Sequence, residues 1–256
     1  MKKIAIYTAL TGQYDQLEDP KVIDSRCDYI CFTNNPPALA NSVWQFRQIP
    51  NVSTNQVLLS RYPKMHPHLL LSDYDYSVYM DANIQIIGKD LYTRIFDKIE
   101  KGVILSGIKH PFRDCPYDEG YVVFTYNLDK ISNILRTLLF LKKQGFPQHY
   151  GMFEANVILR NNQSEKIKKQ CEEWWDLINR FSRRDQLTYP YTLWKNSIPF
   201  DYIIPEGQSA RNYKAFAFTS HLRKKNIWGK KLKRIGKLIY NLIVNLFHRF
   251  RNQLPA

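Results

Sequence analysis

The segment that most constrains the fold is Tyr74–Ile86, with the sequence YDYSVYMDANIQI. Its alternating, aromatic-rich pattern is typical of a buried β-strand, and the pattern stops at Asp81-Ala82-Asn83. Asp81 and Asn83 are two residues apart, so extended backbone places both side chains on one face. Mg²⁺ and Mn²⁺ prefer oxygen ligands and are often completed by substrate phosphates. The segment therefore predicts a metal site for a nucleotide diphosphate, although a turn with Asp81 and Asn83 bonded to the backbone has the same pattern.

The rest of the chain alternates between strand and helix patterns. Strands are expected within Ile4–Leu17, Asp28–Asn35 and Val103–His110, and helices over Asp90–Gly102 and Leu128–Phe146. This alternation indicates an α/β domain, in which a ligand binds beyond the ends of the strands.

Two groups of residues near the start of the chain suit a nucleotide ligand. The first strand runs into a Thr/Gly turn, and the residues at its end that are expected to contact the nucleoside are Thr8, Ala9 and Thr11. Arg61 and Lys64 lie three positions apart within Ser60–Leu71, so a helix there places both on one face, just before the Asp81 strand. Two cations suit a metal-bound diphosphate, but a solvated basic helix face has the same spacing.

Two later motifs carry candidate catalytic carboxylates. Glu154 and Asn156 introduce an apolar strand, and two residues apart they share a face in extended backbone, where Glu154 is a candidate catalytic carboxylate. A strand-edge glutamate in water is the alternative. The segment Ser164–Leu187 is expected to be a helix capped by Ser164, with Asp185 presented as a general base at the head of the next element. A capping aspartate has the same pattern.

An ordered series of motifs resembles a known family. The motifs are YTALTGQYD, FTN, R-x-x-K-x-x-P-H, YDYSVYMDANI, KHPFRDCPYDEG, GMFEANVILR and FSRRDQL, within roughly residues 4–190. Together they resemble the bacterial branch of the TOD1/MUCI70 glycosyltransferase-like family.

The resemblance implies a GT-A-like fold, a nucleotide-sugar-binding α/β sandwich with a mixed central sheet. It also implies a Mn²⁺ or Mg²⁺ ion at an Asp-x-Asp-like motif, where Asn83 stands for the second acid. By the same resemblance, Arg184-Asp185-Gln186 falls where related enzymes contact the acceptor, and His221 is a third metal or phosphate contact. In such a reaction Glu154 could position the acceptor, or stabilise or attack the anomeric carbon of the sugar. Asn156 and Gln186 are also expected at the nucleotide-sugar site.

The C-terminal tail concentrates the charge of the chain. No acidic residue follows Glu206, and twelve cations account for most of the formal net charge of +14: Arg211, Lys214, Arg223, Lys224, Lys225, Lys230, Lys231, Lys233, Arg234, Lys237, Arg249 and Arg251. Apolar residues recur every three or four positions from Trp228 to Phe250, which predicts a basic amphipathic helix. We therefore expect an enzyme domain over residues 1–222 and a tail over 223–256 that lies on an anionic membrane. A helix docked on the enzyme's own core is the alternative.

These patterns predict a glycosyltransferase that moves a sugar, expected to be UDP-linked, to a cell-surface glycan or lipid-linked acceptor. The start of the chain resembles a strand more than a signal peptide, which predicts a cytoplasmic protein at the inner face of the membrane. The four cysteines are expected to be reduced, partly buried thiols. The alternatives are a metal-dependent hydrolase that activates water at Asp81 and a basic nucleic-acid-binding module. The second is disfavoured, because the cations lie on the tail and the aromatics lie elsewhere.

Overall fold

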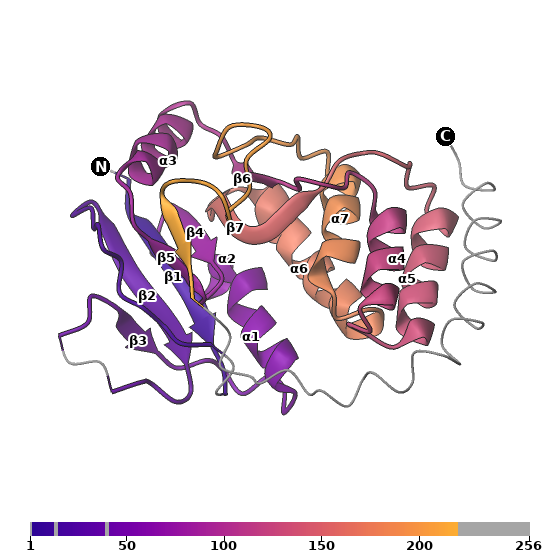
Figure 1. Cartoon of the computed structure of the whole chain (residues 1–256), viewed down its shortest axis with the longest axis horizontal. Helices are drawn as coiled ribbons and strands as arrows, with labels where there is room; N and C mark the ends of the chain where they lie inside the picture. The colour runs from indigo at the N-terminus through magenta and orange to yellow at the C-terminus, as the bar shows by residue number, and fades with distance from the viewer. Residues whose placement is uncertain (1, 13–14, 39–40, 220–256) are drawn as a thin grey trace.

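A computed structural model describes residues 2–12, 15–38 and 41–219, and its centre is a six-stranded mixed sheet (Figure 1). The strand order is β3-β2-β1-β4-β7-β6. The strands are β1 (Ile4–Leu10), β2 (Cys27–Thr33), β3 (Gln45–Arg47), β4 (Tyr76–Met80), β6 (Leu105–Lys109) and β7 (Phe153–Asn161). Strands β1 to β4 are parallel, whereas β7 is antiparallel to both β4 and β6. The predicted α/β class with a mixed central sheet is confirmed.

Helices cover both faces of this sheet. They are α1 (Gln56–Met65), α2 (Pro67–Leu70), α3 (Asp90–Glu100), α4 (Pro116–Thr125), α5 (Ile131–Lys143), α6 (Glu165–Arg180), α7 (Tyr189–Lys195) and the 3₁₀ turn η1 (Asp185–Leu187). Strands β1 and β4 are buried along their whole length, as expected for parallel strands with helices on both sides. Helices α4 and α5 form a separate layer beside α6 and α7 (Figure 1).

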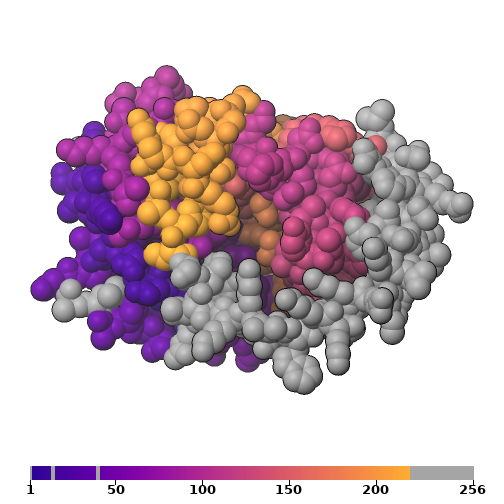
Figure 2. Space-filling view, in the orientation of Figure 1, coloured from indigo at the N-terminus to yellow at the C-terminus, as the bar shows by residue number. Residues whose placement is uncertain are grey.

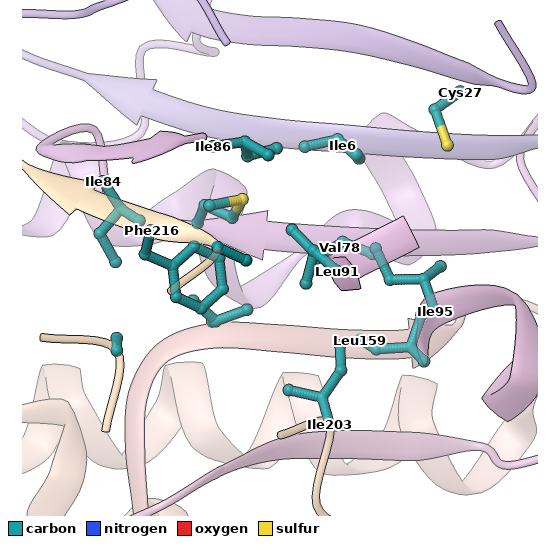
Figure 3. Packing of buried hydrophobic residues seen from close by; sticks show 14 of the residues in the cluster. Ile6, Cys27, Val78, Ile84, Ile86, Leu91, Ile95, Leu159, Ile203 and Phe216 are labelled. Carbon is teal, nitrogen blue, oxygen red and sulfur yellow. The ribbon is translucent and has the colours of Figure 1, made fainter. Parts of the chain in front are cut away.

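Alternate side chains of the central strands pack into two different hydrophobic cores, one on each face of the sheet. On one face, Ile6 and Val78 pack with Leu91 and Ile95 of α3, as Figure 3 shows. On the other face, Tyr7 and Tyr79 pack with residues of α1, α6 and α7. Because side chains alternate along a strand, Asp81 continues the row of Tyr79 and emerges on the face that carries α1. This alternation decides which helix residues can reach Asp81.

The long strand predicted over Tyr74–Ile86 is two strands. Strand β4 ends at Met80, and the backbone turns at Asp81, whose carbonyl accepts a hydrogen bond from the Ile84 amide at 2.9 Å. The chain then continues as β5 (Ile84–Ile86), which pairs with β8 (Phe216–Phe218) in a separate two-stranded sheet. The strand expected before Asp81 is therefore confirmed, and its expected end at Asp81-Ala82-Asn83 is a turn that leads into β5.

Two helix predictions need correction. The helix predicted over Ser164–Leu187 ends at Arg180, and the Ser164 side chain makes no capping hydrogen bond. After Arg180 the chain leaves the helix, because the Ser182 hydroxyl donates to Asp129 at 2.7 Å and the Ser182 amide donates to Thr137 at 3.1 Å. The helix predicted over Leu128–Phe146 is the shorter α5.

Helix α4 was not predicted, and a glycine explains how closely it packs on α5. A Cβ atom built on Gly120 would lie 2.8 Å from Leu138 Cδ1, which is too close for any other residue without a shift. The first helical residue is Pro116, which suits a position whose amide needs no helical partner. Across the described residues, no helix is long and apolar enough to cross a membrane. The predicted tail over 223–256 lies outside the described residues.

Candidate active site

The end of β4 and the start of β7 meet at one edge of the sheet. Because β7 runs antiparallel to β4, the start of β7 lies at the same edge of the sheet as the end of β4. The Asp81 amide donates to the Asn156 carbonyl at 2.9 Å, which places Asn156 beside Asp81 and Glu154 close by. This is the edge at which open α/β sheets bind ligands. The structure thus brings three of the predicted site residues together: Asp81, Glu154 and Asn156.

Helix α1 and the turn η1 add a buried cluster of charges on the Asp81 face. Lys64 Nζ lies 2.5 Å from Asp185 Oδ2 and 4.0 Å from Asp81 Oδ1. Arg61 Nε lies 3.4 Å from the same Asp185 oxygen. The predicted spacing of Arg61 and Lys64 on one helix face is correct, because both lie within α1 and reach one carboxylate.

Exposure separates the roles of these four side chains. The Lys64 and Asp185 side chains are only 2% and 6% exposed, whereas the Arg61 and Asp81 side chains are 20% and 36% exposed. A ligand can therefore reach Arg61 and Asp81 directly. Lys64 and Asp185 lie behind them and hold them in place.

Buried polar and aromatic groups contact Lys64, Asp185 and Asp81 of this cluster. Arg160 of β7 donates to the Lys64 carbonyl at 2.9 Å, and the Trp174 indole donates to the Asp185 carbonyl at 3.1 Å. The Tyr79 hydroxyl donates to Asp81 Oδ1 at 2.9 Å, and the Tyr79 ring centroid lies 5.0 Å from Lys64 Nζ. Tyr79 therefore orients the Asp81 carboxylate, while Arg160 and Trp174 fix the backbone of Lys64 and Asp185. Hydrogen-bonded groups of this kind keep a buried charge cluster in one arrangement.

The electrostatics of Asp185 do not suit a general base. Burial acts to raise its pKa, but Arg61 and Lys64 outweigh burial and hold the pKa of Asp185 well below its usual range. A carboxylate with a strongly lowered pKa is a poor proton acceptor at neutral pH. The surroundings of Asp185 therefore argue against the general-base role expected from the sequence and favour a positioning role.

Glu154 has the opposite environment. Burial raises the pKa of Glu154, while hydrogen bonds from the Ala210 amide and the Asn156 side chain act against the rise. The Ala210 amide donates to Glu154 Oε2 at 2.9 Å, which fixes the carboxylate at the edge of the sheet. A held carboxylate with a raised pKa is better suited to accept a proton.

The donor set beside Asp81 fits Mg²⁺ or Mn²⁺ held together with a substrate phosphate. Asp81 offers a half-exposed carboxylate. The backbone turns after Asp81, so the extended geometry that predicted a shared face for Asp81 and Asn83 is absent, and Asn83 is mostly buried. In addition, Asn156 Oδ1 is buried without a hydrogen-bond partner, so an acceptor beside Asp81 remains available. Magnesium needs only one or two carboxylates when phosphates supply other ligands.

The remaining predicted residues lie at different distances from this cluster. Thr8 is buried on the sheet face opposite Tyr7, so the structure does not bring it to Lys64, and its hydroxyl has no hydrogen-bond partner. Ala9 alternates back to the Tyr7 face, while the Thr11 hydroxyl donates to the Gln56 carbonyl at 3.1 Å. Gln186 reaches the Phe153 carbonyl at 3.5 Å, next to Glu154. His221 lies outside the described residues.

A second cluster of charged side chains lies near η1. Arg113 Nε lies 2.5 Å from Glu119 Oε2, and Arg113 Nη2 lies 3.1 Å from His110 Nε2. The nearby Arg184 has a buried Nε without a hydrogen-bond partner. Arg113 and Glu119 both stand in the KHPFRDCPYDEG motif, but the helix α4 that carries Glu119 was not predicted. Figure 2 shows the segment before and within β8 (yellow-orange) on the face of the molecule toward the viewer.

A comparison with protein-family models decides the family of the chain. The model described as "TOD1/MUCI70, glycosyltransferase-like domain" matches residues 40–211, which is more than half of the 256 residues. The chain belongs to the TOD1/MUCI70 glycosyltransferase-like family. The resemblance predicted from the motifs is confirmed, and the matched range includes Arg61, Lys64, Asp81, Glu154 and Asp185.

Solved structures similar to this TOD1/MUCI70 family member include two glycosyltransferase-related proteins. The apo structure of the bifunctional enzyme WbbM aligns with a TM-score of 0.46 and 12% identity, over 78% of this chain and 38% of its own. Core-mannan synthase A from Aspergillus fumigatus, in a Mn/GDP form, aligns with a TM-score of 0.44 and 9% identity, over 79% of this chain and 73% of its own. The chain thus spans well under half of WbbM. No curated protein sequence matched the chain.

Proposed function

We propose that the protein transfers a sugar from a nucleotide-diphosphate donor to a glycan or lipid-linked acceptor. The observation that carries the proposal is the convergence of Asp81, Arg61 and Glu154 at one edge of the sheet. This edge offers a half-exposed carboxylate and a partly exposed guanidinium for the diphosphate, with a second carboxylate held close by. Membership of a glycosyltransferase-like family supports the same reaction class.

The donor diphosphate binds at the exposed side of the cluster. Arg61 contacts the phosphates, because planar guanidinium groups recognise phosphate oxygens well. Lys64 is buried beneath Asp81, and its ammonium group fixes the positions of the Asp81 and Asp185 carboxylates. A UDP-linked sugar is our first choice of donor.

Asp81, Asn83 and the Asn156 side chain would hold Mg²⁺ or Mn²⁺ at this edge. When bound, the ion neutralises the charge that grows on the leaving diphosphate. Glu154 takes the proton of the acceptor hydroxyl as the new glycosidic bond forms, and the nucleotide diphosphate leaves with the electrons of the broken bond. Asp185 serves as a positioning residue that orients Arg61 and Lys64.

Asp81→Ala is expected to abolish manganese-dependent binding of a nucleotide diphosphate. Wild-type protein should show a higher melting temperature with one of UDP, GDP or CDP in the presence of Mn²⁺, because a ligand that binds only the folded state stabilises it. The variant should show no shift with the same pair of ligands. Asp97→Asn is the matched control, since Asp97 is half-exposed and pairs with Lys101 on the surface of α3. Equal shifts in the wild type and in Asp81→Ala would reject the proposed donor site.

We also propose that residues 223–256 hold the enzyme at the inner face of the membrane. Deleting them removes ten of the twelve cations that follow Glu206. Each cation near an anionic leaflet contributes about 1 kcal/mol, so the shortened protein should stop sedimenting with vesicles that contain phosphatidylserine. A second variant keeps the amino-acid composition of residues 223–256 but scrambles their order, so that the charge is retained and the apolar face is lost. Its vesicle binding shows how much of the affinity comes from charge alone. Full vesicle binding after the deletion would contradict the proposal, whereas turnover of a soluble donor should be largely retained.

A further inference from the structure

Three side chains outside the proposed active site bring metal-ligating atoms together. Cys115 precedes α4 as its capping residue, Asp118 lies in the first turn of α4, and His149 lies in the loop before β7. One ligand atom from each residue lies within 4.8 Å of the others, and this is the one such group among the described residues. The cluster joins two segments that lie more than thirty positions apart in the sequence.

The chemistry of the three ligands selects zinc over magnesium or manganese. A thiolate is a soft ligand that suits zinc, and imidazole and carboxylate groups complete many zinc sites. In a tetrahedral site with bond lengths of about 2.0–2.3 Å, ligand atoms lie roughly 3.3–3.8 Å apart. Cys115 is buried and His149 is half-exposed, so a modest movement of the more exposed side chains would close the site. Three protein ligands leave the fourth position to water.

The surroundings hold the cluster in this arrangement. Asp114 Oδ1 lies 2.8 Å from His149 Nδ1, which is the contact that a carboxylate makes when it orients a metal-binding histidine. The Gly151 amide donates to the Asp114 carbonyl at 2.8 Å and ties the loop before β7 to the segment that leads into α4. The ligands are therefore positioned by the backbone before any ion binds.

We propose that Cys115, Asp118 and His149 bind one Zn²⁺ ion, with Asp114 orienting His149. The ion would link the start of α4, through Cys115 and Asp118, to the loop before β7, through His149. The segment before α4 carries Arg113, whose partner Glu119 lies in the first turn of α4 next to Asp118. A bound ion would therefore also hold the Arg113–Glu119 pair in place. The site is distinct from the oxygen-only site at Asp81 and does not depend on the function proposed above.

Metal analysis of the full chain tests the proposal. Protein prepared with zinc and then dialysed should retain about one Zn²⁺ per chain, and a chelator should lower its melting temperature until zinc is restored. Cys115→Ser and His149→Gln should each lower zinc affinity at least tenfold. Asp81→Ala should retain the zinc, which separates this site from the donor site. Asp176→Asn is the surface control, because Asp176 is exposed and pairs with Arg180.

Cobalt spectroscopy keeps the test decisive if a variant fails to fold. Wild-type protein loaded with Co²⁺ should show thiolate-to-cobalt charge transfer and the intense visible bands of a tetrahedral site. Absence of these bands, or zinc content unchanged in Cys115→Ser, would overturn the proposal. In that case Cys115 is a buried capping thiol, and His149 and Asp114 form only a surface pair.

Discussion

Asp185→Asn is expected to lower the free energy of unfolding by about 3–5 kcal/mol, because it leaves the buried Lys64 ammonium group without its carboxylate. Asp185 Oδ2 lies 2.5 Å from Lys64 Nζ and 3.4 Å from Arg61 Nε, and the Lys64 and Asp185 side chains are almost fully buried. The asparagine side chain is similar in shape but carries no charge. Urea unfolding followed by circular dichroism gives the difference.

The pH dependence of this difference has a defined sign. The neighbouring cations hold the pKa of Asp185 well below its unfolded value, so its contribution is fully present above an unfolded pKa of about 3.9. As the pH falls below that value, the contribution shrinks, and it is lost when the pH passes the folded pKa. The difference in the free energy of unfolding between the wild type and Asp185→Asn should therefore become smaller at acidic pH.

A surface carboxylate provides the comparison. Asp176→Asn breaks an exposed pair with Arg180 and should change stability by no more than about 1 kcal/mol. If Asp185→Asn were as stable as this control and lost only turnover, Asp185 would be the general base expected from the sequence. Stability loss together with weaker donor binding supports the positioning role.

Much of the sheet could be predicted from the sequence, because buried strands have short apolar runs with clear ends. The run IAIYTAL is β1 and the run YSVYM is β4, and Asp81 follows directly at a strand end. The spacing of Arg61 and Lys64 was informative because both lie on one helix face. These local periodicities are set by 3.6-residue and two-residue repeats that any buried element must obey.

The partners of each side chain could not be predicted in the same way. Whether Asp185 is a base or a buried ion-pair partner depends on α1, which lies far away in sequence. Helix α4 was missed because its close contact with α5 is made possible by Gly120, a residue that argues against a helix locally. The cluster of Cys115, Asp118 and His149 shows no metal-ligand spacing, since its third member comes from a distant loop.

Glu154→Gln is expected to lower kcat by about 10²–10⁴-fold with little change in donor binding, because it removes the proposed proton acceptor. Burial raises the pKa of Glu154, so wild-type activity should fall as the pH drops through this raised value, above the ordinary glutamate pKa of about 4.3. The glutamine oxygen can still accept the hydrogen bond from the Ala210 amide, so the fold and the melting temperature should be preserved.

The pH profile separates proton transfer from a structural role for Glu154. In Glu154→Gln, the residual activity should lose the acidic limb that the wild type shows, because no carboxyl group titrates at that position. Glu165→Gln changes an exposed carboxylate that pairs with Lys168 on α6 and should leave both kcat and the profile unchanged. If Glu154→Gln retained wild-type kcat and the same acidic limb, Glu154 would only tether the Ala210 backbone. The proton acceptor would then have to be sought among other groups at this edge of the sheet.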